Sequence, residues 1–174
     1  LFRDFMTGIL KSILKNTDKD EIDSKIIEFK NNIKTADIYD IALPTGVKNL
    51  KKFKDTRVKN NGVFTALKKG TPVHVKAAWK YNDLLNHFEL SNHEQIKSSD
   101  KIKWIYLKDN PFSIPQLAFK GYDDPDAIIE DVIKKYIDYE KLFDKALYKK
   151  IKTWYEALDW SQPVDKKYTL ERFF

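Results

Sequence analysis

The chain has 174 residues and a mass of 20.6 kDa, which suits one domain with a hydrophobic core and is short for two ordinary domains. Hydrophobic residues make up 42% and charged residues 33% of the sequence, a composition typical of globular rather than disordered proteins. Cysteine is absent, which excludes disulfides, thiol nucleophiles and zinc–thiolate sites, and we expect neither a membrane span nor a signal peptide.

The net charge of +6 is unevenly distributed. The segment 44–82 has Asp55 as its one acid and carries +9, which leaves −3 for the remainder. A basic block in an otherwise slightly acidic chain is typical of proteins that bind a polyanion, above all nucleic acid. The alternative is a solvated surface rich in lysine, the residue that supplies 29 of the 32 cations. The candidate DNA-binding cations are Lys48, Lys51, Lys52, Lys54, Arg57, Lys59, Lys68, Lys69, Lys76 and Lys80.

The first residues predict a helix over 1–14, because their apolar side chains recur at helical spacing. The only methionine, Met6, falls inside this helix, so we expect the chain to be a fragment of a longer protein. Asp18 and Glu21 form a capping box that opens a second helix. A short strand is predicted over 38–43.

The basic stretch 48–69 predicts a short helix followed by a loop. Thr71 then caps a helix that runs to about Phe88, with Pro72 at its first position, where the missing N–H costs nothing. Strands are predicted at 101–107, from alternating apolar side chains, and at 116–120.

The C-terminal third predicts a short helix from Pro125, with Ile128, Ile129 and Val132 inward, and then a long helix over 139–158 with one apolar face. Residues 161–174 read as a flexible tail after a domain over 1–160. The expected fold class is α+β, mostly helical with a small antiparallel sheet.

Catalytic motifs are missing from the sequence, including the Walker loop, GxGxxG, GxSxG and HExxH. The three histidines are spaced too irregularly to predict a metal site. An acidic cluster at Asp123, Asp124 and Asp126 could attract a divalent ion, but helix N-capping explains it better. We therefore expect no catalytic residue, metal or cofactor in this chain.

The predicted helix after Thr71 presents Lys76, Lys80 and Tyr81 on nearby faces, from which they can follow a phosphate backbone. Lysine is a flexible point charge suited to phosphate contact. Arginine is scarce in the block, which argues against base reading through bidentate arginine–guanine pairs.

Three stretches carry a family resemblance. Residues 70–82 read GTPVHVKAAWKYN, residues 103–112 read KWIYLKDNPF, and the third runs from 137 to 145. Together with the Phe-rich end of the chain, they resemble, in the same order, the family B replicative DNA polymerases of T-even-type phages. The chain is thereby identified as similar to their thumb domain and C-terminal tail, over nearly its whole length.

The resemblance implies a polymerase-thumb-like fold that wraps primer–template duplex DNA, within a DNA-directed DNA polymerase in the cytoplasm of the infected host cell. The catalytic carboxylates and their magnesium ions would belong to the palm, upstream of this fragment, which alone would be inactive. Lys145 and Lys149 stand where the family turns lysines toward DNA. The stretch 113–116, by contrast, lacks a lysine that the family can carry.

The last seven residues, 168–174, follow a polar spacer with Pro163 and end on two phenylalanines. Exposed aromatic side chains at a terminus suggest a partner pocket. Leu170, Phe173 and Phe174 have the spacing of sliding-clamp ligands, and the resemblance makes the clamp phage-encoded. The alternative to a DNA-gripping thumb is a free-standing protein-interaction domain with incidental surface lysines; a small independent enzyme is a third hypothesis.

Overall fold

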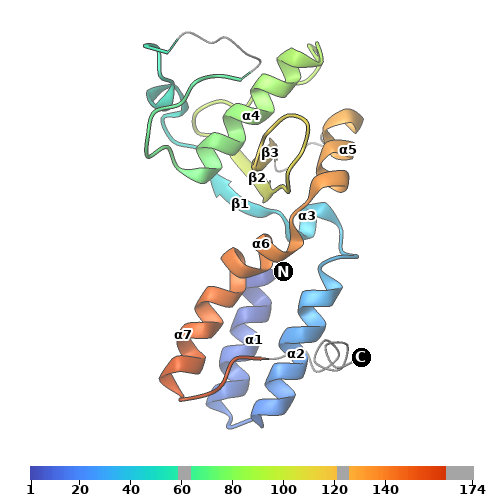
Figure 1. The fold of residues 1–174 in the computed structure, drawn as a ribbon, viewed down its shortest axis with the longest axis vertical. Coiled ribbons are helices and arrows are strands. Elements are labelled where there is room, and N and C mark those ends of the chain that lie inside the picture. The colour runs from blue at the N-terminus through green and yellow to red at the C-terminus, as the bar shows by residue number, and fades with distance from the viewer. Residues whose placement is uncertain (59–63, 121–125, 164–174) are drawn as a thin grey trace, which may run out of the picture. The chain divides into compact units, whose positions relative to one another are not determined.

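The computed structural model describes residues 1–58, 64–120 and 126–163. These residues form helices and a three-stranded antiparallel sheet, which confirms the predicted α+β class (Figure 1). The chain divides into two compact units: unit 1 combines Leu1–Ile41 with the chain from Tyr139 onward, and unit 2 is Ala42–Asp138. The predicted domain over 1–160 spans both units, and the predicted tail lies outside the described residues beyond Pro163.

Unit 1 is helical. Its core is formed by apolar side chains from both the N-terminal and the C-terminal helices of the chain. Its elements are α1 (Phe2–Leu14), α2 (Lys19–Asn32), α3 (Ile38–Ile41), α6 (Tyr139–Phe143), a π-helical segment (Asp144–Tyr148) and α7 (Lys149–Ala157). Ile9, Ile22, Ile26, Leu147, Ile151 and Tyr155 are buried in this core.

The predicted helix starts in unit 1 are largely confirmed. Asp18 caps α2 and accepts a hydrogen bond from the Asp20 N–H at 2.9 Å, whereas Glu21 pairs with Lys25 instead of completing a capping box. The predicted strand over 38–43 is wrong for its first four residues. They form α3, because the Asp37 carboxylate accepts the Tyr39 N–H at 2.8 Å and starts a helical turn.

The predicted long helix over 139–158 is present but contains the π segment, which changes the helical phase along its length. Leu142, Phe143, Leu147, Ile151 and Tyr155 are buried as expected. Leu158 lies beyond the end of α7 and is 41% exposed, so the apolar face ends before it.

Unit 2 is a small sheet covered by a helix. Strands β1 (Leu43–Gly46), β2 (Lys101–Tyr106) and β3 (Gln116–Lys120) pair in the order β1-β2-β3, and α4 (Val73–His87) packs against β2 and β3. In the register of the sheet, Trp104 on the central strand β2 pairs with Leu43 of β1 and with Ala118 of β3. Ala77 and Ala78 are fully buried on α4, and small side chains allow a helix to approach a sheet closely.

The remaining elements of unit 2 are a 3-10 helix, η1 (Leu50–Phe53), and α5 (Ala127–Tyr136). Pro72 is the N-cap of α4, and the Thr71 hydroxyl donates to the Lys68 carbonyl instead of capping the helix. Asp126 caps α5 as predicted. The prediction that Ile128 points inward is wrong, since it is 43% exposed in the first turn while Ile129 and Val132 are buried.

Among the described residues, no helix has both the length and the apolar character needed to cross a membrane.

Candidate nucleic-acid interface

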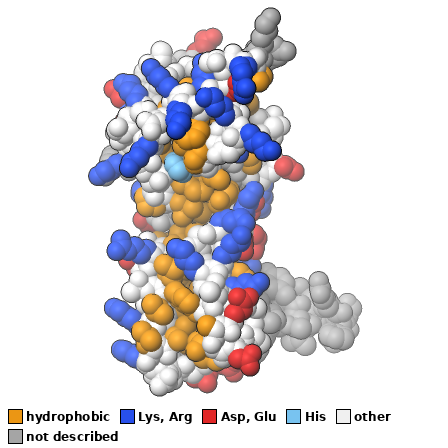
Figure 2. All heavy atoms as spheres, turned by 90° about the vertical axis from the view of Figure 1, so that its left-hand side faces the viewer, with side chains coloured by type: hydrophobic (Ala, Val, Ile, Leu, Met, Phe, Trp, Pro, Cys, Tyr) orange, Lys and Arg blue, Asp and Glu red, His pale blue; other side chains and the backbone are white. Residues whose placement is uncertain are grey.

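Most of the predicted DNA-binding cations lie together in unit 2, where Lys and Arg side chains gather on the face shown in the upper part of Figure 2. We call the described cations between Lys48 and Lys80 the basic segment. Lys59 lies outside the described residues. The members of the basic segment are Lys48, Lys51, Lys52, Lys54, Arg57, Lys68, Lys69, Lys76 and Lys80.

Backbone pairing brings the two halves of the basic segment side by side. Lys54 and Leu67 form an antiparallel bridge, in which the Lys68 N–H donates to the Phe53 carbonyl at 2.9 Å. The Lys68 ammonium donates to the Lys52 carbonyl at 2.7 Å. Cations that are up to sixteen residues apart in the sequence therefore share one small region.

Aromatic side chains support this region from α4 and the adjoining loop. Trp79 donates from Nε1 to the Leu50 carbonyl at 3.1 Å, and the Lys54 ammonium lies 5.8 Å from the centre of the Trp79 ring. The Lys80 ammonium lies 4.1 Å from the centre of the Phe64 ring, within the range of a cation–π interaction. Burial lowers the pKa of Lys80, and the nearby Asp83 carboxylate offsets part of that effect.

The lysines of the basic segment have no carboxylate partner within ion-pair distance in the described part of the chain. Elsewhere many lysines are paired, for example Lys120 with Glu94 at 2.7 Å. Within the segment, Arg57 binds Asp55 through two contacts of 3.1 and 3.2 Å, and its guanidinium lowers the pKa of that carboxyl. Local ion pairs thus leave most of the positive charge uncompensated, as a polyanion-binding surface requires.

Tyr81 was predicted among the DNA-binding residues, and the structure does not support that prediction. Its side chain is only 3% exposed, because it falls on the face of α4 that packs into unit 2, so it cannot lie against a bound duplex. The neighbouring Lys80 and Trp79 are half-buried and reach the surface.

Lys145 and Lys149 lie in unit 1, on the π segment and at the start of α7. Both are exposed. Lys145 is 3.5 Å from the Asp144 carboxylate, and its ammonium lowers the pKa of Lys149, the cation four residues later. Two ammonium groups this close together make a concentrated positive charge.

The candidate metal ligands do not converge within the described ranges. No group of three or more His, Cys, Asp or Glu side chains there could hold a metal ion. Asp126 caps α5 and lies 3.2 Å from His93, whereas Asp123 and Asp124 fall outside the described residues. The capping interpretation is therefore confirmed for Asp126.

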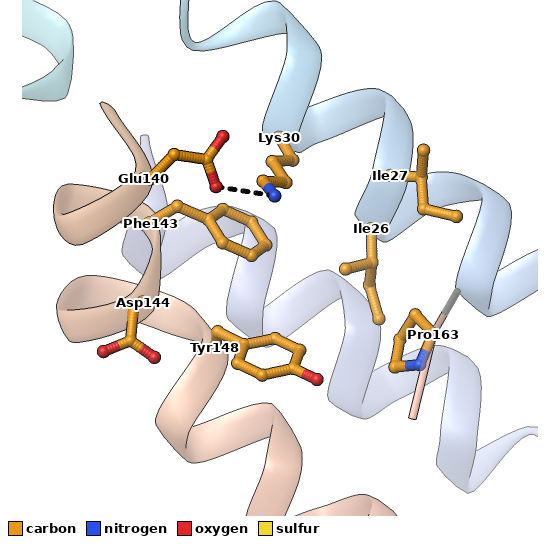
Figure 3. Close-up of a pocket in the computed structure, with 8 residues that line it drawn as sticks. All are labelled: Ile26, Ile27, Lys30, Glu140, Phe143, Asp144, Tyr148 and Pro163. Atoms are coloured by element: carbon orange, nitrogen blue, oxygen red, sulfur yellow. Dashed lines mark ion pairs between the residues drawn. The ribbon is translucent and has the colours of Figure 1, made fainter. Parts of the chain in front are cut away.

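Unit 1 contains a pocket of about 370 Å³ that sequence reasoning did not find (Figure 3). Ile26, Phe143, Tyr148 and Pro163 line it, and the ion pair of Lys30 with Glu140, at 2.7 Å, lies at its side. The Tyr148 hydroxyl donates to Gln162 at 2.8 Å. Glu140 and Asp144 both line the pocket, which makes it unsuited to a phosphate group.

Two polar residues near the end of α4 were also missed by sequence reasoning. Asn82 and Asp83 are both buried and each holds a loop: Asn82 bonds the backbone of Ile96, and Asp83 bonds Thr65. The available signal was two adjacent polar side chains inside a predicted helix. If such side chains are buried they need hydrogen-bond partners, which here are provided by the two loops.

The predicted clamp-binding residues lie outside the described part of the chain; they are Leu170, Phe173 and Phe174.

Comparison with protein families and curated sequences gives no relative onto which the site can be mapped: no protein-family model matches the chain, and no curated protein sequence matches it.

Proposed function

We propose that unit 2 binds the sugar–phosphate backbone of double-stranded DNA without sequence preference. The observation that carries this proposal is the basic segment, whose lysines have no carboxylate within ion-pair distance among the described residues while many other lysines of the chain are paired. Lysines of this kind are point charges that neutralise phosphates and read no base edges.

The biological setting that we propose is the thumb of a family B replicative DNA polymerase. The similarity of residues 70–82 and 103–112 to that family supports it, since both stretches lie in unit 2 and the first contains Lys76 and Lys80 of the basic segment. In this setting the chain would grip the primer–template duplex, Lys145 and Lys149 would add contacts, and the palm of the parent chain would supply catalysis.

We also propose that the end of the chain binds a sliding clamp. The support is the sequence pattern of Leu170, Phe173 and Phe174 after a polar spacer. Such a tail would tether the polymerase to DNA while the thumb holds the duplex.

The test is a salt titration of duplex binding by the 174-residue chain. A labelled duplex of about 20 base pairs is titrated by fluorescence anisotropy between about 50 and 200 mM NaCl, where each phosphate contact contributes about 0.9 to the log–log slope. Replacing Lys68, Lys69, Lys76 and Lys80 together by Ala should flatten the slope by about three to four units.

A control variant removes the same charge elsewhere. Lys11, Lys15, Lys101 and Lys108 are exposed lysines outside the basic segment, and their joint replacement by Ala should leave most of the slope intact. A shallow wild-type slope, or equal flattening by both variants, would contradict the assignment and favour a protein-interaction domain with incidental lysines.

A further inference from the structure

Asp83 is an acid set into the most basic part of the molecule. Its side chain lies on the inner face of α4 and is 5% exposed. The carboxylate accepts two hydrogen bonds from one residue, Thr65: from the backbone N–H at 2.8 Å and from the hydroxyl at 2.7 Å. A buried carboxylate with two donors is a strong, directional anchor.

This anchor fixes the stretch that carries the second half of the basic segment. Thr65 lies two residues before Leu67, which forms the bridge with Lys54, and the residue after Leu67 is Lys68, whose ammonium donates to the Lys52 carbonyl. On its other side it adjoins Phe64, whose ring lies 4.1 Å from the Lys80 ammonium. Lys80 and Asp83 are three residues apart on α4. One helix therefore holds two neighbouring residues of the loop, because Lys80 contacts the Phe64 ring and Asp83 binds Thr65.

We infer that Asp83 is a positioning residue for polyanion binding: through Thr65 it holds Lys80 and Lys68 in the arrangement that meets phosphates. The inference rests on the proposed function. It means that an acidic residue beside the basic segment strengthens the binding of a negative ligand through its hydrogen bonds and not through its charge, because ordered cations lose less conformational entropy when they bind than mobile ones.

Charge counting alone predicts the opposite. Removing an acid beside lysines raises the positive potential and should tighten DNA binding. Two substitutions separate these effects. Asp83→Asn removes the charge but keeps groups that can bond both polar atoms of Thr65, whereas Asp83→Ala removes the charge and the anchor together.

The adjacent residue provides a matched control for stability. Asn82 is 4% exposed and also makes two hydrogen bonds to one residue, donating to the Ile96 carbonyl at 2.9 Å and accepting the Ile96 N–H at 2.7 Å. Its loop lies outside the basic segment. Asn82→Ala therefore breaks an anchor of similar kind and burial while leaving intact the Asp83–Thr65 contact that holds Lys80 and Lys68 in the proposal; its loop contacts the first half of the basic segment through the backbone near Leu50, whose N–H donates to the Ser98 hydroxyl at 3.0 Å.

The experiment measures duplex binding by the full chain and its variants across the salt range given above. Asp83→Ala should weaken binding about fivefold or more and flatten the log–log slope by about one to two units, as expected when one or two phosphate contacts are lost. Thr65→Ala, which changes no charge, should weaken binding in the same direction. Asp83→Asn and Asn82→Ala should stay within about twofold of the wild type or bind more tightly.

Two results would overturn the inference: wild-type or tighter binding by Asp83→Ala and Thr65→Ala, or equal weakening by Asn82→Ala. Thermal unfolding of each variant verifies that it is folded, and Thr65→Ala serves if Asp83→Ala does not fold.

A second readout separates this inference from the proposed function. The Phe64 ring should shift the NMR resonance of the Lys80 side-chain methylene next to the ammonium, and Asp83→Ala should abolish that shift. If the wild type shows no salt-dependent binding, the proposed function fails. A shift that is absent from the wild type, or that survives in Asp83→Ala, shows instead that Asp83 does not position Lys80.

Discussion

Tyr155 connects α7 to α2 through a hydrogen bond from its hydroxyl group, and removal of that hydroxyl gives a quantitative test of the core of unit 1. The side chain has no exposed surface, and its hydroxyl donates to Asp23 Oδ1 at 2.5 Å. Asp23 also pairs with the Lys19 ammonium at 2.5 Å, and the Trp160 ring stands edge-on to the Tyr155 ring at 5.3 Å. Tyr155→Phe keeps the ring packing and removes only the hydroxyl.

The expected loss follows from the charge of the acceptor. A hydrogen bond to an ionised group contributes about 1.5–3 kcal/mol to stability, so Tyr155→Phe should lower the free energy of unfolding by about that amount at neutral pH. Burial, and next the hydrogen bond to Asp23, raise the pKa of Tyr155 in the folded protein above its ordinary value.

The direction of this pKa shift sets the pH dependence. Because the folded state holds the phenol proton more tightly, this contribution is fully present below the unfolded pKa of about 10 and is lost as the pH rises above it. The loss amounts to about 1.4 kcal/mol per pH unit for one group. Phenylalanine has no such proton, so the stability difference between wild type and Tyr155→Phe should shrink above about pH 10.

Urea unfolding followed by circular dichroism, at several values between about pH 7 and 11, measures both effects. Asp23→Asn, alone and combined with Tyr155→Phe, isolates the pairwise interaction as a double-mutant cycle. A difference below about 0.5 kcal/mol at neutral pH would refute the reasoning, as would a difference that stays constant through the alkaline range.

Two further predictions concern the proposed polymerase setting. A synthetic peptide of residues 161–174 should bind the cognate sliding clamp with about micromolar affinity, since burying an apolar side chain contributes about 1.5–3 kcal/mol before ordering costs. Replacing Phe173 and Phe174 by Ala should abolish this binding in a titration by calorimetry, and equal clamp binding by chains with and without residues 168–174 would contradict it. The 174-residue chain should neither extend a primer nor degrade DNA with magnesium present, because two-metal phosphoryl transfer needs convergent carboxylates that the resemblance assigns to the parent chain. Metal-dependent nucleotide incorporation above that of a matched inactive preparation would show otherwise.

Local sequence signals predicted the elements whose determinants lie within a few residues. Helix α1, strand β2 and the caps at Asp18 and Asp126 all appear in the structure, although burial along β2 does not follow the predicted alternation, since Ile105 is fully buried and Trp104 is only half-buried. The uneven charge also located the candidate site, because clustered lysines are visible in the sequence whatever the fold.

Tertiary packing decided the features that depend on distant residues. Tyr81 and Lys80 are neighbours in the sequence, yet only the packing of α4 on the sheet shows that one is buried and the other reaches the surface.

The bridge of Lys54 with Leu67 and the anchor of Asp83 on Thr65 join residues thirteen and eighteen positions apart. Such contacts form only if the hydrogen bonds and buried surface outweigh the entropy of closing the loop. No short window of sequence contains that balance, because it depends on both partners and on the helix and sheet that bring them together.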